Sequence, residues 1–267
     1  MGKTSPADTS QRDAVTLHLR ALRLPSFVSH HEEIASQAEK GGWTFTQYLR
    51  HLCDLEMDAR RQRKEERLQK QSDLPGEKTL ATLDLARLPA PVRRQLPSLC
   101  EGHFLGKAVN VLAFGLPGRG KTHVLCAIGH ELIKRGYAVL FIAAFRLVQR
   151  LLTAKRDLCL DKEMKKLDSF DAVLIDDIGY VQQDREEMEV LFTFLAERYE
   201  RRSVMISSNL VFSQWDQIFK NPMTTLAAID RLVHHSIILE MTNKRSIREE
   251  EAEKNVLSAN SKKEPTA

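Results

Sequence analysis

The chain has 267 residues, of which 42% are hydrophobic and 28% are charged, and this balance excludes a wholly disordered protein. Its length suffices for one main domain and a smaller N-terminal piece. Forty lysines and arginines against 36 aspartates and glutamates give a net charge of +4, which permits a nucleic-acid partner without requiring one.

The cysteines and the hydropathy pattern indicate a cytoplasmic protein. None of the four cysteines forms a C-x-x-C pair, so we interpret them as reduced, mostly structural thiols. No apolar run approaches the roughly 18 residues of a membrane-spanning helix, and no signal peptide is recognisable. Pro6 stands where a myristoylation motif requires Ser or Thr. We therefore expect no membrane partner.

A small all-helical N-terminal domain is predicted over residues 11–75, after a flexible polar stretch over residues 1–10. Alternating leucines and Val15 predict a short amphipathic helix that Pro25 should stop. Residues 34–38 should continue the helical region. This arrangement is typical of an interaction domain rather than of a catalytic one.

A second, longer helix is predicted after the break at Gly41-Gly42. Thr44-Phe45-Thr46-Gln47 has the form of a capping box, and apolar residues at helical spacing follow it. Beyond Ala59 the apolar stripe gives way to basic residues, which form a candidate surface for DNA phosphates or for a partner. These are Arg60, Arg61, Arg63, Lys64, Arg67 and Lys70.

The nucleotide domain is predicted over residues 76–250, after a hinge at residues 72–76, and a polar tail follows over residues 251–267. The connection up to about Gly106 should be partly helical. Apolar runs then alternate with helical patterns, which predicts a parallel five-stranded sheet with helices on both faces. The strands are expected over residues 108–114, 138–143, 171–176, 203–208 and 236–240, and the helices over residues 121–135, 145–154, 185–201 and 213–219.

A glycine-rich loop lies between the first of these strands and the helix that follows it. Glycines let backbone N–H groups close around phosphate oxygens, and the helix N-terminus adds positive potential. In this pattern the lysine reaches the β- and γ-phosphates of a nucleoside triphosphate, and the threonine coordinates Mg²⁺. The residues are Gly115, Leu116, Pro117, Gly118, Arg119, Gly120, Lys121 and Thr122.

Two carboxylates follow the apolar strand that ends at Ile175. A buried parallel strand delivers such groups to the carboxyl edge of the sheet, beside the phosphates. We expect Asp176 to hold Mg²⁺, directly or through water, and Asp177 to polarise the attacking water. Asn209, which ends the next strand, should orient that water.

The base is predicted to be adenine. Asp176-Asp177-Ile178-Gly179 also fits the D-x-x-G pattern of GTPases, which share the phosphate loop. Those proteins recognise guanine with an N-K-x-D segment, whereas Asn243-Lys244-Arg245-Ser246 lacks the aspartate. The sequence thus favours ATP over GTP.

Two further sets of residues lie near the last strand. Arg231 is a candidate arginine finger, a residue that a neighbouring subunit often supplies, and this role would make activity depend on assembly. His234 and His235, like His30 and His31, have no acidic or cysteine residue at ligand spacing. We interpret all four histidines as ordinary polar residues.

The ordered motifs resemble those of the IstB family, the transposition helper ATPases of bacterial insertion sequences. The resemblance covers residues 13–250 and implies kinship with DnaC-type helicase loaders and the initiator clade of AAA+ ATPases. The fold that it implies is an AAA+ three-layer P-loop sandwich. The resemblance is carried by residues 115–123, 175–180, 198–200, 207–209, Trp215 and residues 230–235.

The resemblance implies a role for each matching residue. Lys121 and Thr122 would be the Walker A pair, Asp176 and Asp177 the Walker B pair, Asn209 sensor 1 and Arg231 the arginine finger. It also adds His123 and Arg248 to the residues at the nucleotide, Arg248 as a candidate sensor 2.

The chain departs from the usual AAA+ pattern in two ways. Asp177 stands where AAA+ proteins usually carry a longer Glu, which favours slow or partner-dependent hydrolysis. Few residues follow Glu240, so no full helical lid domain is expected.

The resulting hypothesis is an ATP-dependent helper that assembles on duplex DNA as a homo-oligomer, largely without sequence preference. It would select target DNA and stimulate a transposase encoded by the same element through ATP binding and hydrolysis, with Mg²⁺ as the metal. Two alternatives stay open. One is a DnaC-like helicase loader, and the other is a nucleotide-ordered scaffold without significant hydrolysis.

Overall fold

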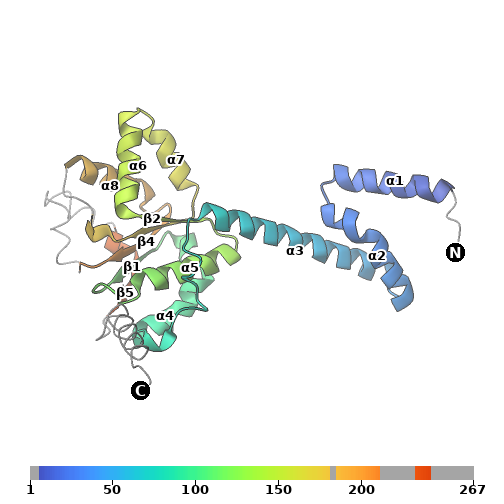
Figure 1. The fold of residues 1–267 in the computed structure, drawn as a ribbon, viewed down its shortest axis with the longest axis horizontal. Helices are drawn as coiled ribbons and strands as arrows, with labels where there is room; N and C mark the ends of the chain where they lie inside the picture. The colour runs from blue at the N-terminus through green and yellow to red at the C-terminus, as the bar shows by residue number, and fades with distance from the viewer. Residues whose placement is uncertain (1–5, 181–184, 211–231, 242–267) are drawn as a thin grey trace, which may run out of the picture. The chain divides into compact units, whose positions relative to one another are not determined.

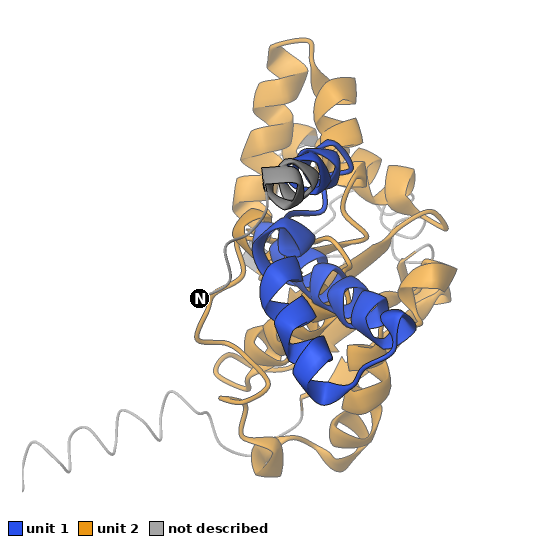
Figure 2. Cartoon of the chain, turned by 90° about the vertical axis from the view of Figure 1, so that its right-hand side faces the viewer, with its two compact units in different colours: residues 1–67 blue, residues 68–267 orange. Residues whose placement is uncertain are grey.

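A computed structural model provides the structure, which describes residues 6–180, 185–210 and 232–241 (Figure 1). The chain forms two compact units, residues 1–67 and residues 68–267, which Figure 2 colours separately. The division falls inside helix α3 (Phe45–Gln71), earlier than the predicted boundary near residue 75. The reason is that Leu68 and Leu74 belong to a hydrophobic cluster of the second unit.

The first unit contains helices α1 (Pro6–Ala21), α2 (Pro25–Gly41) and most of α3. Residues 6–10, which were expected to be flexible, lie in α1. Pro25 stands at the start of α2, where its missing N–H is not needed. A small core of Phe27, Ile34 and Leu52 joins α2 to α3.

The predicted capping box opens α3. The Thr44 backbone N–H donates to Gln47 Oε1 at 2.8 Å, and the Gln47 N–H donates to Thr44 Oγ1 at 3.3 Å. These reciprocal bonds satisfy two of the backbone donors that the first turn of a helix leaves without partners.

A buried carboxylate, Glu56, anchors the basic part of α3. It accepts hydrogen bonds from the Ser26 backbone N–H at 2.9 Å and from Arg60 Nε at 2.7 Å, and Arg63 lies 3.5 Å away. Burial alone would raise the pKa of Glu56, but the bonds from Arg60 and Ser26 lower it below its ordinary value. Arg61 is paired with Asp58. Half of the predicted basic run is therefore neutralised within the helix.

The second unit is built on a parallel sheet in the order β2-β3-β4-β1-β5 (Figure 1). Every observed pairing is parallel, as predicted. All carboxyl ends of the strands therefore meet at one edge. The strands are β1 (Asn110–Phe114), β2 (Val139–Ala143), β3 (Ala172–Asp176), β4 (Ser203–Ser208) and β5 (Ser236–Glu240).

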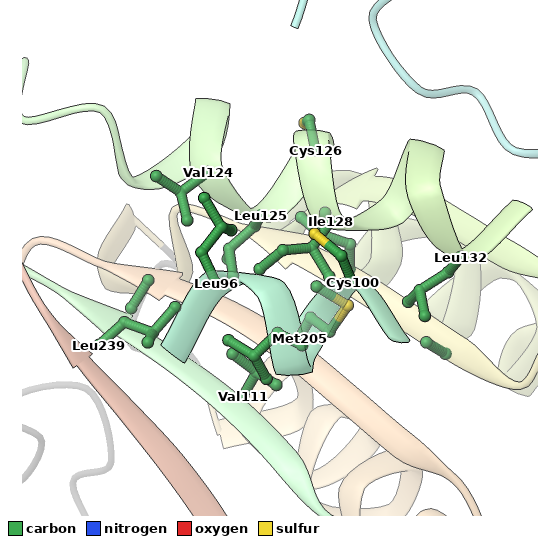
Figure 3. Close-up of a cluster of buried hydrophobic side chains, with 14 of the residues drawn as sticks. Leu96, Cys100, Val111, Val124, Leu125, Cys126, Ile128, Leu132, Met205 and Leu239 are labelled. Carbon is green, nitrogen blue, oxygen red and sulfur yellow. The ribbon is translucent and has the colours of Figure 1, made fainter. Parts of the chain in front are cut away.

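Helices cover both faces of the sheet, which completes the predicted three layers (Figure 1). Alternate residues of β1 face opposite ways: Leu112 packs with α6 (Ala144–Arg156) and α8 (Arg185–Arg198), whereas Val111 packs with α4 (Ala90–Glu101) and α5 (Lys121–Lys134). Figure 3 shows side chains of α4 and α5, among them Leu96 and Ile128, meeting strand residues in the second cluster. Short 3₁₀ turns lie at Leu85–Arg87, Leu105–Lys107 and Ile178–Tyr180.

Some expectations differ from the structure or lie outside it. Helix α7 (Leu160–Asp168) was not predicted. The predicted helix over residues 213–219 and the residues that bear on a lid domain lie outside the described residues. Within the part of the chain that the structure describes, no helix has the length and apolar character needed to cross a membrane.

Candidate nucleotide-binding site

The glycine-rich loop connects β1 to α5 at the carboxyl edge of the sheet. Gly118 and Gly120 adopt positive φ values of 73° and 82°, a region that other residues enter at a cost. At Gly115, a Cβ atom would lie 2.5 Å from the backbone oxygen of Met241. The glycines are therefore required by the backbone path, and the loop leads directly into the N-terminus of α5.

Lys121 lies at the first position of α5 with only 5% of its surface exposed. Its Nζ donates to the backbone oxygens of Gly115 and Leu116, at 2.7 and 3.0 Å, and to Asn209 Oδ1 at 2.5 Å. The ammonium group is thus folded back over the loop and held by oxygen acceptors. Phosphate oxygens are stronger acceptors of the same kind.

Arg119 supplies an independent sign of an anion site. Its Nε and Nη1 atoms are buried and have no hydrogen-bond partner among the described residues. Buried donors without partners are costly and rare, and a missing ion or ligand commonly explains them. A polyphosphate at the loop fits these donors.

Asp176 and Thr122 form the candidate magnesium site. Asp176 ends β3, and its Oδ1 accepts hydrogen bonds from Thr122 Oγ1 at 2.8 Å and from Ser207 Oγ at 2.6 Å. A hydroxyl and a carboxylate side by side are the hard oxygen donors that Mg²⁺ prefers. The residues present therefore fit this ion.

Asp177 follows in a left-handed backbone conformation, with φ of 57°. Such a conformation costs about 1–3 kcal/mol for a residue with a side chain and persists only when its surroundings enforce it. Two bonds hold it: its N–H donates to Ser207 Oγ at 2.8 Å, and its Oδ1 accepts from Asn209 Nδ2 at 3.3 Å. Asn209 thus joins Lys121 to Asp177.

The structure therefore brings together Lys121, Thr122, Asp176, Asp177 and Asn209, from three separate segments of the chain. His123 contacts a different region, because its Nε2 lies 3.2 Å from both Thr82 Oγ1 and the Thr79 backbone oxygen. Arg231 and Arg248 lie outside the described residues.

Sequence reasoning gave no role to two groups of residues. Ser207 links the two carboxylates, and its signal in the sequence is its place in the segment 207–209, which ends a strand and carries part of the family resemblance. The second omission concerns His234 and His235, because the structure places Glu200 beside them. That carboxylate is distant in sequence, so no local spacing could have revealed it.

Comparison with known proteins assigns the chain to a family. A family model described as "IstB-like ATP binding protein" matches residues 17–255. The chain belongs to this IstB-like family. A Sinorhizobium fredii relative, named as an insertion sequence ATP-binding protein, is 41% identical over 84% of this chain and 75% of its own length. The corresponding IS21 protein of Pseudomonas aeruginosa is 32% identical, with 91% of each chain covered.

Solved structures confirm the fold expected of an IstB-like protein. DnaA from Aquifex aeolicus, bound to AMPPCP, has a TM-score of 0.56 at 20% identity, and the match covers 70% of this chain and 56% of that one. DnaI gives 0.53 at 19% identity, with 63% of this chain and 95% of that chain covered. These likenesses agree with the expected AAA+ fold.

Proposed function

We propose that this protein is an ATP-hydrolysing helper for transposition, which assembles on duplex DNA as an oligomer, selects target DNA and stimulates a partner transposase. The observation that carries the ATPase part is the chain of contacts from Lys121 through Asn209 to Asp177. The insertion-sequence relatives support the transposition part.

Nucleotide binding begins with an exchange of partners at Lys121. Its Nζ leaves the carbonyl oxygens of Gly115 and Leu116 for β- and γ-phosphate oxygens, while backbone N–H groups of the loop donate to the same phosphates. Thr122 and Asp176 would hold Mg²⁺, which supplies charge neutralisation at the β- and γ-phosphates. Arg119 gives the anion its otherwise unpaired donors.

Hydrolysis rests on Asp177 and Asn209. The Asp177 carboxylate accepts a hydrogen bond from the attacking water and raises its nucleophilicity, and the Asn209 amide fixes the carboxylate from the side. Ser207 holds the backbone of Asp177 in place. Asp177 is shorter than the usual Glu, so the carboxylate reaches the water less closely, and we expect slow turnover without a partner.

The proposed arginine finger acts on a neighbouring subunit. Arg231 lies outside the described residues. Arginine fingers are often supplied by a neighbouring subunit, and the resemblance of residues 230–235 to the IstB motif supports the same role here.

DNA contacts are proposed at the basic residues of α3 that remain exposed. Among the described residues, Lys64 and Arg67 have no ion pair, whereas Arg60 and Arg61 are paired with carboxylates. DNA phosphates can therefore contact Lys64 and Arg67 without first breaking an ion pair. Such contacts predict binding with little sequence preference that weakens as salt rises.

The test is ATP turnover measured alone, with duplex DNA, and with DNA and the transposase of the same element. We expect stimulation by DNA, loss of nucleotide binding and assembly in Lys121→Ala, and retained ATP binding without turnover in Asp177→Asn. Mixing Arg231→Ala with Asp177→Asn should restore activity, because the Asp177→Asn subunit supplies Arg231 and the Arg231→Ala subunit supplies Asp177. Wild-type turnover by Arg231→Ala alone would exclude the finger.

The same measurements separate the alternatives. A nucleotide-ordered scaffold would show no turnover above that of Asp177→Asn, even with DNA. A helicase loader would bind a replicative helicase and leave transposase activity unchanged. The two relatives reported above are insertion-sequence proteins, whereas the likeness to DnaI and to the DnaC helicase loader concerns the fold alone, and this difference favours transposition.

A further inference from the structure

Glu200, His234 and His235 form a cluster at the start of β5. One potential ligand atom from each residue lies within 4.8 Å of the other two. His235 Nε2 is 3.4 Å from Glu200 Oε1, and the two imidazole rings are 4.2 Å apart between centroids. All three residues are exposed, so a dissolved ion can reach them.

A backbone hydrogen bond holds one side of this cluster, and the other side has an unusual backbone conformation. On one side, the His235 carbonyl accepts the Asn110 N–H at 2.7 Å, which ties the histidines to the sheet. On the other side, Glu200 has a left-handed backbone with φ of 57°, a strained conformation of the kind that often occurs at functional sites. The ligand atoms are thus brought together by the fold itself.

We propose that Glu200, His234 and His235 bind a divalent transition-metal ion, with Zn²⁺ preferred. Two imidazole nitrogens and one carboxylate oxygen are a common zinc ligand set, and three protein ligands leave a fourth position for water or an external ligand. The Tyr199 hydroxyl lies 3.4 Å from His234 Nδ1 and provides an outer contact that orients the ring.

This site is separate from the nucleotide site. His235 pairs with the first residue of β1, at the edge of the sheet opposite the phosphate loop. The two sites also differ in chemistry, because Mg²⁺ prefers oxygen ligands alone. An ion at His234 and His235 would stiffen the turn that follows Arg231. That consequence rests on the proposed function, whereas metal binding does not.

The experiment is a calorimetric titration of the full chain with Zn²⁺, without a histidine tag and without nucleotide. Exposed Cys53 and Cys159 are first replaced by serine, so that thiolates do not contribute. We expect one ion per chain. Glu200→Gln and His235→Ala should each weaken binding by at least about tenfold, since even outer partners of a metal site are worth that much.

A matched control is available in the other adjacent histidine pair. The double variant His30→Ala/His31→Ala removes the same residue types from α2 and should leave zinc affinity unchanged. Co²⁺ absorption gives a second readout, because nitrogen ligands alter its visible spectrum, and Glu200→Gln should change it without altering ATP affinity. The proposal fails if the wild-type chain binds no zinc, or if Glu200→Gln and His235→Ala bind it as tightly as wild type.

Discussion

Ser207 is the residue whose removal tests the candidate site most sharply. Its side chain is fully buried, and its single hydroxyl makes two bonds. It donates to Asp176 Oδ1 at 2.6 Å and accepts the Asp177 N–H at 2.8 Å. Ser207→Ala therefore removes a bond to a carboxylate and leaves a backbone donor without its partner.

The cost follows from these two bonds. A hydrogen bond to a charged group contributes about 1.5–3 kcal/mol, and a buried unsatisfied N–H costs about 1–3 kcal/mol. Both aspartates are partly exposed, so water recovers part of this energy, and we expect Ser207→Ala to lower the free energy of unfolding by about 3 kcal/mol. Turnover should fall as well, because Asp177 can then relax out of its strained conformation.

Ser208 provides the control. It is equally buried, and its hydroxyl also makes two bonds, to the backbone oxygen and N–H of Leu210 at 2.8 and 3.1 Å. Ser208→Ala should cost about 1–2 kcal/mol in urea unfolding and leave ATP turnover nearly unchanged. Equal loss of turnover in Ser207→Ala and Ser208→Ala would refute the reasoning, as would an unfolding free energy of Ser207→Ala that matches wild type.

Three further outcomes can be measured. Gly115→Ala places a Cβ 2.5 Å from the Met241 oxygen and should lower the free energy of unfolding by about 2–4 kcal/mol, whereas Gly76→Ala, with nothing within 4 Å, should not. The pKa of Glu56 is lowered in the folded protein, so its carboxylate contributes stability that is present above the ordinary pKa of about 4.5 and is lost as pH falls through the folded value. Glu56→Gln should therefore destabilise more at pH 7 than in acid below the folded pKa, and an equal effect at both would contradict this. Burial raises the pKa of the Cys100 thiol to about 11 and that of the Cys126 thiol to about 12, whereas Cys53 and Cys159 are exposed. A thiol reagent at pH 8 should therefore modify only Cys53 and Cys159 before denaturation. Modification of all four thiols in the native protein would contradict this prediction.

The sheet could be predicted closely because its signal is local. Strands β4 and β5 have the bounds expected from their apolar runs, and the reciprocal bonds of Thr44 and Gln47 follow directly from the capping-box pattern. Each depends on residues that are neighbours in the chain. Such patterns survive folding because tertiary packing reinforces them.

Helix α7 shows where local signals fail. Its sequence is rich in charge, and only Leu167 is fully buried. The helix is stabilised by neighbours distant in sequence, including the ion pair between Arg150 of α6 and Glu163. A nine-residue helix is marginal by itself, so periodicity alone could not establish it.

Pro25 shows a second kind of limit. A proline ends one helix and favours the first turn of the next equally well, so the same residue predicts a stop or a start. The structure has both, since α1 ends at Ala21 and α2 begins at Pro25. Phe27 and Ile34 of the second helix pack with Leu52 of α3, a contact that the local pattern around Pro25 does not record.

The candidate site also depends on packing that no motif records. Helix α5 carries the phosphate loop at its N-terminus, and along its length two histidines hold the segment that precedes α4. His123 Nε2 lies 3.2 Å from Thr82 Oγ1, and His130 Nε2 lies 3.0 Å from the Pro75 backbone oxygen. Any shift of α5 on nucleotide binding must either carry this segment with it or break these bonds. The loop pattern identifies what binds, whereas these contacts determine which part of the chain responds.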